Sequence, residues 1–200
     1  MEKLAASDHP IHEVIRSRWS PRAFSKKPVP ADALKSLFEA ARWAASSYND
    51  QPWAYIVATG EDTENFNKLL SVLMEGNQIW AKNAPVLALA VARLNFHHNG
   101  SPNRVAVYDV GAASANLTFE ATARGLAVHQ MAGFYPDKAR EVFQIPVGWE
   151  PIAALAIGYP GDADGLPENL RQAEAAPRSR KPLSEFVMTG VWGKPSPLVR

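Results

Sequence analysis

Two long apolar runs limit what this chain can fold into. Residues 84–92 (APVLALAVA) and residues 151–158 (PIAALAIG) carry no charged side chain. Successive side chains of a β-strand point to opposite faces of its sheet, so a strand that is apolar at every position must be covered on both faces. The sequence therefore predicts two fully buried strands.

Apolar periodicity and capping residues predict the other elements. Strands are expected over residues 53–58 and 127–131. Helices are expected over residues 30–45, 103–124 and 136–143, near residues 11–15 and after Asp62. Residues 159–177 are polar and are expected to form loops. Residues 1–200 are predicted to form a single α+β domain. Its last part, about residues 161–200, has few apolar side chains of its own, so we expect an extended arm that packs on a partner subunit.

Composition excludes several classes of function. The net charge of +1 provides no field for nucleic acid or an anionic membrane, and the chain has no cysteine for disulfides or thiol chemistry. Without an apolar membrane span or signal-peptide core, the sequence predicts a cytoplasmic protein. His97 and His98 lack further ligands at metal-site spacing, and dinucleotide, P-loop and serine-hydrolase motifs are absent.

The sequence RWSPR near the N-terminus is a candidate anion-binding segment. Its proline favours an extended backbone, so Arg18, Ser20 and Arg22 point the same way. Two guanidinium groups beside a hydroxyl can bind a phosphate. A solvated basic turn is the alternative interpretation.

A second basic segment, PRSRKP, lies near the C-terminus. Arg178 and Arg180 alternate along it, so they too can face one ligand. Together the two segments would fit a single phosphate that is held by parts of the chain far apart in sequence. A solubilising stretch in a tail is the alternative.

Residues 41–53 predict the edge of a site for a planar ligand. Here a helix is expected to end at a compact polar turn that carries Ser46, Ser47 and Asn49, and a strand follows at once. These hydroxyl and amide groups can form hydrogen bonds around the rim of a heteroaromatic ring, while neighbouring aromatic residues supply apolar surface.

Two further candidates are a strand end and an amide. Residues 130–134 (QMAGF) lie at the end of a predicted strand, where Gly133 would let the backbone approach a ligand closely. A turn glycine explains the same residues equally well. Asn77 could offer its amide to a heterocycle, and a role in a turn or at a helix end is the alternative.

Taken in order, these motifs resemble those of the nitroreductase family of FMN-dependent oxidoreductases. The similarity runs along nearly the whole chain. It is carried by RxSxRxF (residues 18–24), AASSxNxQPW (44–53), Asn77 ahead of the strand that starts with Ala84-Pro85, DxGxA (109–113), GL (125–126), GYP (158–160) and RxRKPL (178–183).

The resemblance implies a three-layer fold, with a central, mainly antiparallel sheet flanked by helices, and a homodimer that exchanges its C-terminal arms. FMN would bind at the subunit interface. The serines and the asparagine of the 46–49 turn would reach the flavin of the other subunit, and the backbone near Ala132 would lie at the reactive N5 atom. The cofactor-binding residues implied for this chain are Arg18, Trp19, Ser20, Arg22, Ser46, Ser47, Asn49, Asn77, Met131, Ala132, Gly133, Arg178 and Arg180.

The implied activity is hydride transfer from NADH or NADPH through FMN to nitroaromatics, quinones or similar acceptors. Because the cofactor does the chemistry, no catalytic side chain and no metal are expected. Both substrates would use one pocket in turn, which gives ping-pong kinetics. Two alternatives stay open: a flavoprotein of the same fold that reduces an unsaturated carbonyl or semialdehyde or remodels a flavin, and a non-catalytic FMN-binding protein.

Two positions depart from the family pattern. Ala45 stands where many relatives have proline, and Ala132 stands where some have glutamate. Alanine at position 132 removes a side chain from beside the flavin, so the substrate preference of relatives does not transfer to this chain.

Replacing Arg22 by alanine is expected to weaken FMN binding. A charge-assisted hydrogen bond contributes about 1.5–3 kcal/mol, which corresponds to a rise of roughly tenfold to a hundredfold in the FMN dissociation constant. Titration with FMN, followed by flavin fluorescence, measures the change. A dissociation constant equal to that of the wild type would contradict the role assigned to Arg22.

Overall fold

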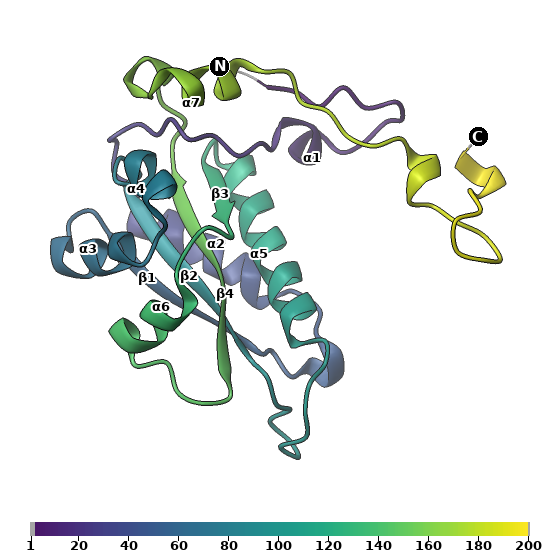
Figure 1. Cartoon of the computed structure of the whole chain (residues 1–200), viewed down its shortest axis with the longest axis horizontal. Coiled ribbons are helices and arrows are strands. Elements are labelled where there is room, and N and C mark those ends of the chain that lie inside the picture. Colours follow the sequence, from purple (N-terminus) through teal and green to yellow (C-terminus); the bar gives the residue numbers. More distant parts are fainter. Residues whose placement is uncertain (1–2, 200) are drawn as a thin grey trace.

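The computed structural model describes residues 3–199, which contain a four-stranded antiparallel sheet. Helices lie on both sides of this sheet (Figure 1). The predicted α+β class, with a central antiparallel sheet flanked by helices, is therefore confirmed. The strand order is β1 (Trp53–Thr59), β2 (Val86–Arg93), β4 (Trp149–Gly158) and β3 (Ala127–Met131).

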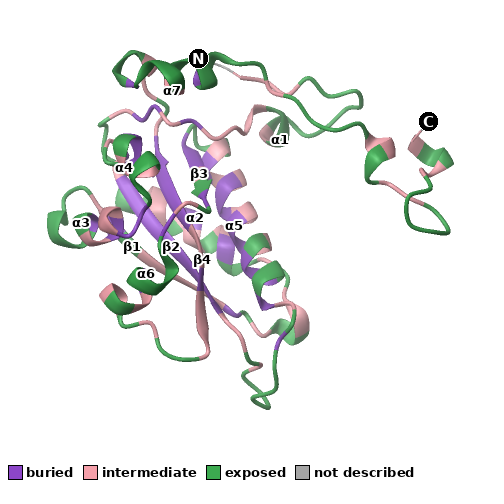
Figure 2. Cartoon of the chain, viewed as in Figure 1, coloured by how far each residue is buried: buried purple, intermediate pink, exposed green. Residues whose placement is uncertain are grey.

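Strand β2 is the centre of the core, and its two faces pack against different helices. Leu87, Leu89 and Val91 belong to a buried cluster that includes residues of α3 (Thr63–Ser71), α4 (Glu75–Ala81) and α6 (Pro136–Phe143). The alternate positions, Val86, Ala88, Ala90 and Ala92, belong to a second cluster with α2 (Ala31–Arg42) and α5 (Ala106–Ala123). Figure 2 shows the buried strands between helices whose outer faces are exposed.

Small side chains let α5 pack closely on the sheet and on α2. Ala113, Leu117 and Ala121 are fully buried, and Asn116 Nδ2 donates a hydrogen bond to the carbonyl oxygen of a residue in α2 at 3.2 Å. The helix ends before Gly125, whose φ of +71° is the left-handed conformation that the sequence predicted. No helix within residues 3–199 is long and apolar enough to cross a membrane.

Two helices were not predicted from the sequence. Helix α4 has no side-chain cap at its start and carries a glycine and an asparagine near its first turn. Helix α7 (Glu168–Ala175) lies in the segment expected to form loops, and Glu174 is its single buried residue. Neither helix has the repeated apolar stripe by which the others were recognised. The short first helix was predicted, and it spans α1 (Glu13–Ser17).

The C-terminal arm leaves the core after α7 (Figure 1). It contains two short 3₁₀ turns, Leu183–Glu185 and Pro197–Val199. The side chains of Phe186, Val191 and Trp192 are 59%, 67% and 92% exposed. Exposed aromatic residues on an extended arm agree with a surface that another molecule covers, and exchange of the arm in a homodimer stays a prediction.

Beyond β4 the chain pairs with an extended N-terminal segment. The N–H of Gly161 donates to the carbonyl of Ala23, and the N–H of Ser25 donates to the carbonyl of Tyr159, both at 2.9 Å. A Cβ atom added at Gly161 would lie 2.5 Å from the carbonyl carbon of Phe24, far inside van der Waals contact. This close approach fixes the path of the chain that leads out of the first arginine-rich segment.

Replacing Gly161 by alanine is expected to lower the free energy of unfolding by about 1–3 kcal/mol, because the added carbon must displace backbone. Urea denaturation measures the change. Gly165→Ala is the matched control, since a Cβ added there meets no atom within 4 Å; its effect should stay within about 0.5 kcal/mol. Equal effects of the two substitutions would rule out the steric explanation.

Candidate functional site

Three arginines from the two ends of the chain lie close together. Arg18 is half-buried, and its Nη1 donates a hydrogen bond to Ser20 Oγ at 3.0 Å. Burial lowers the pKa of Arg18, and the charges of Arg178 and Arg180 lower it further. No ion pair within residues 3–199 involves any of the three. The cluster therefore carries positive charge that no carboxylate of the described chain balances, and such a donor set fits a phosphate.

Arg178 connects the arm to the N-terminal segment. Its Nη1 donates to the carbonyl oxygens of Lys3, at 2.6 Å, and Arg16, at 3.0 Å. Burial lowers the pKa of Arg178, and the charge of Arg180 adds to this effect. Figure 1 shows the chain after α7 running beside the N-terminal segment. The structure thus brings together the two arginine-rich segments, as the sequence suggested, and their role in FMN binding stays a prediction.

The other two N-terminal candidates differ in their surroundings. The guanidinium of Arg22 forms no ion pair with another residue in the range 3–199, while its backbone N–H donates to the carboxylate of Glu174 at 2.9 Å. Trp19 is half-buried, and Lys3 Nζ lies 5.2 Å from the centroid of its ring. Trp19 therefore packs beside the basic cluster without supplying a charge.

His129 on β3 was not among the predicted site residues, although it contacts the first arginine-rich segment. Its Nδ1 lies 2.9 Å from the carbonyl oxygen of Pro21, and its ring centroid lies 4.6 Å from that of Trp80. Because a carbonyl only accepts hydrogen bonds, Nδ1 carries the proton of this pair. Burial lowers the pKa of His129 and Arg22 lowers it further, whereas the Pro21 hydrogen bond and the Glu174 charge oppose the shift.

Asn77 and Gly133 form a second part of the candidate site. Asn77 lies near the start of α4, and its Nδ2 donates to the carbonyl oxygen of Gly133 at 2.9 Å; the N–H of Met74 donates to the same oxygen at 3.0 Å. A Cβ atom at Gly133 would lie 2.5 Å from Asn77 Nδ2, so a larger residue there would force the Asn77 amide to move. Met131 is buried at the end of β3, and Ala132 after it is exposed.

The turn after α2 has positive φ values at residues other than glycine. Tyr48, Asn49 and Gln51 have φ values of 55°, 53° and 49°, a left-handed conformation that costs of the order of 1–3 kcal/mol for each residue. Two hydrogen bonds stabilise it: the N–H of Ser47 donates to buried Asp109 at 3.1 Å, and the N–H of Gln51 donates to Ser46 Oγ at 3.0 Å. Strain of this kind is common at functional sites.

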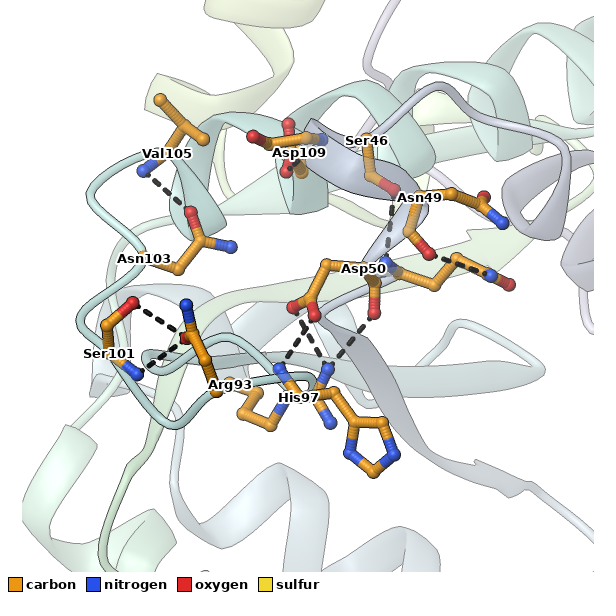
Figure 3. Close-up of polar contacts among 12 residues, drawn as sticks. Ser46, Asn49, Asp50, Arg93, His97, Ser101, Asn103, Val105 and Asp109 are labelled. Carbon is orange, nitrogen blue, oxygen red and sulfur yellow. Dashed lines mark hydrogen bonds and ion pairs between the residues drawn. The ribbon is translucent and has the colours of Figure 1, made fainter.

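An ion pair below the turn holds it in place (Figure 3). The side chain of Asp50 is 2% exposed and accepts hydrogen bonds from Arg93 Nη2 at 2.9 Å and from the N–H of His97 at 2.8 Å. Burial alone would raise the pKa of Asp50, but these bonds and the charge of Arg93 lower it. No group of three potential metal-ligating side chains occurs in the part of the chain that the structure describes.

The turn and the arginine cluster lie far apart in one chain. The N–H of Ser47 donates to Asp109, which is in the first turn of α5. The carbonyl of Pro21 accepts a hydrogen bond from His129, which is on β3, the strand that follows the C-terminal end of α5. Helix α5 has 18 residues and is therefore about 27 Å long. Figure 1 places the two segments toward opposite ends of this helix, so a single chain does not bring all the predicted residues into one site.

Residues 15–159 match the model of the nitroreductase family. The chain belongs to this family. The resemblance seen in the sequence motifs is thereby confirmed.

Individual proteins show the same relationship. A crystal structure of an oxidoreductase containing FMN is 36% identical, covers 94% of this chain and 96% of its own, and superimposes with a TM-score of 0.88. An uncharacterized 15.4-kDa protein of Mycolicibacterium smegmatis is 38% identical over 68% of this chain and 92% of its own. FMN reductase [NAD(P)H] of Bacillus subtilis is 29% identical over 81% of this chain and 72% of its own.

Acid is expected to destabilise the protein through His129. The native pKa of this residue lies below its ordinary value of about 6.5, so the unfolded chain takes up a proton before the native one does. The stability that neutral His129 contributes is therefore fully present above about pH 6.5, and it is lost as the pH falls toward the native pKa. Urea unfolding at pH 8 and pH 5.5 should show a smaller loss for His129→Asn than for the wild type. Equal losses would show that His129 does not contribute.

Proposed function

We propose that this protein takes hydride from NADH or NADPH and reduces nitroaromatics, quinones or similar acceptors with FMN, by a ping-pong mechanism in a homodimer. The observation that carries the proposal is the group of arginines, unpaired with any carboxylate within residues 3–199, in a chain of the nitroreductase family. The general class, an NAD(P)H-dependent FMN oxidoreductase, is confirmed by the family match together with the FMN-containing structure and the FMN reductase among its relatives.

The two arginine-rich segments suit the phosphate end of FMN. The guanidinium groups of Arg18, Arg178 and Arg180 supply positive charge. Arg22, on the same segment as Arg18, adds a fourth guanidinium group. The backbone of Arg18 and Arg22 is held by hydrogen bonds, and the guanidinium of Arg178 is held by the carbonyl oxygens of Lys3 and Arg16, which limits the conformational entropy lost when the phosphate binds. Asn77 and the strand end at Gly133 would then meet the ring system.

The positions of the turn and of the C-terminal arm support the homodimer of this proposal. The strained turn with Ser46, Ser47 and Asn49 lies away from the arginine cluster of its own chain, and the C-terminal arm exposes aromatic side chains. In a homodimer with exchanged arms, the turn of one subunit would complete the site of the other. The predicted cytoplasmic location stays a prediction from composition.

The chemistry itself requires no nucleophile from this chain. Bound FMN would supply hydride acceptance and donation at N5, and the protein would bind and orient its substrates. The pattern of side chains agrees with this division: the candidate residues are mostly polar, and the small side chain of Ala132 is exposed, where a larger one would restrict the acceptor.

The test is an absorbance spectrum of the purified protein after incubation with FMN, followed by anaerobic addition of NADH or NADPH. Bound flavin whose absorbance bands bleach is the expected result. Protein that binds no FMN would contradict the proposal and would favour a fold that has lost this chemistry.

Acceptors are then compared in steady-state assays. Turnover with nitroaromatics or quinones, and parallel lines in double-reciprocal plots, are expected because both substrates use one pocket in turn. Turnover restricted to an unsaturated carbonyl or semialdehyde would favour the alternative activity, and intersecting lines would exclude the ping-pong mechanism.

A further inference from the structure

Glu174 is a buried acid that binds the backbone of the first arginine-rich segment. Its exposed fraction is 3%. Its Oε1 accepts hydrogen bonds from the N–H groups of Arg22 and Ala23 at 2.9 and 3.0 Å, and its Oε2 accepts a second one from Arg22 at 3.1 Å. A buried carboxylate needs such bonds, since it has lost its hydration. These contacts anchor α7, which buries none of its other residues.

The same residue ties the two arginine-rich segments together. Glu174 precedes Arg178 by four positions, and its backbone carbonyl accepts a hydrogen bond from Lys3 Nζ at 2.5 Å. The backbone carbonyl of Lys3 in turn accepts one from Arg178 Nη1 at 2.6 Å. The path of the first segment and the start of the second therefore depend on one short network around Glu174.

The opposite side of the first segment is also held. The carbonyl of Pro21 faces His129, and the carbonyl of Ala23 accepts a hydrogen bond from Gly161. These contacts hold carbonyl groups of Pro21 and Ala23, whereas Glu174 accepts from the N–H groups of Arg22 and Ala23. Removal of the carboxylate would leave two buried or half-buried donors without a partner and would release that part of the backbone.

We propose that Glu174 is a positioning residue for phosphate recognition, because its carboxylate binds the backbone N–H groups of Arg22 and Ala23 and so holds this part of the backbone in place. This inference rests on the proposed function, in which the arginines bind the phosphate of FMN. The carboxylate occupies the N–H groups of Arg22 and Ala23, so the phosphate is left to the guanidinium groups and to Ser20 Oγ. The backbone that carries Arg22 is thereby held in place before the ligand arrives.

The test compares Glu174→Gln with Glu168→Gln. Glu168 lies on the same helix but is exposed and forms an ion pair with Arg171, so it controls for loss of an acidic side chain from α7. Dissociation constants are measured for FMN and for riboflavin, which has the same ring system without the phosphate. Hydrogen exchange of the peptide that covers residues 18–25 is measured without ligand.

The expected result is selective for the phosphate. Glu174→Gln removes the charge that strengthens these hydrogen bonds and replaces one acceptor oxygen by an NH₂ donor that cannot accept from Arg22 or Ala23. It should therefore raise the dissociation constant for FMN about tenfold, the effect of ordering roughly one additional residue on binding, and should leave the dissociation constant for riboflavin unchanged. Exchange at Arg22 and Ala23 should become faster. Glu168→Gln should change none of these quantities. Glu174→Asp keeps the charge on a shorter side chain, and it should restore part of the FMN affinity.

Other outcomes overturn the inference in distinguishable ways. Equal losses for FMN and riboflavin would show that Glu174 supports the fold in general. Faster hydrogen exchange at residues 18–25 with an unchanged dissociation constant for FMN would overturn the inference and would leave the proposed function standing. Wild-type protein that binds neither flavin would overturn the proposed function and this inference with it. If Glu174→Gln does not fold, the same comparison is made with Glu174→Asp, for which equal affinities of variant and wild type for FMN would overturn the inference.

Discussion

The antiparallel pairing of β2 with β4 is the interaction on which the rest of the structure depends. Alternate residues of β2 enter two different buried clusters, so both faces of the sheet must be covered by helices. Polar groups that bind a ligand are therefore confined to the ends of strands and helices, where backbone groups and water remain accessible. Gly133 lies beyond β3 and the strained turn lies before β1.

The candidate site depends on contacts between distant parts of the chain. The arginine-rich segment lies in no helix or strand of the sheet, and its shape comes from Glu174, His129 and Gly161. Each of these contacts uses a backbone group of the segment, so the arginine side chains are left unconstrained by them and can face a ligand. A rigid backbone with charged side chains is the arrangement that limits the entropy lost on binding.

Features with a local cause could be predicted from the sequence. Pro136 opened a helix over residues 136–143, Gly125 ended another, and residues 127–131 formed a strand, all at the expected places. Contacts across long separations could not be predicted in the same way: Glu174 meets a backbone 151 positions away, and His129 meets one 108 positions away. Helix α7 was not predicted because its one buried residue is acidic, so the sequence there has no apolar stripe that indicates a buried helix face.

The separation of the arginine cluster from the 46–49 turn along α5 has a genetic consequence. In a two-fold dimer, each of the two equivalent sites would draw its arginines from one subunit and its turn from the other. A mixed dimer with Arg22→Ala in one subunit and Asn49→Ala in the other would then carry both defects in one site and none in the second. Two individually defective genes would complement each other, which is a behaviour that a site built within one chain does not allow.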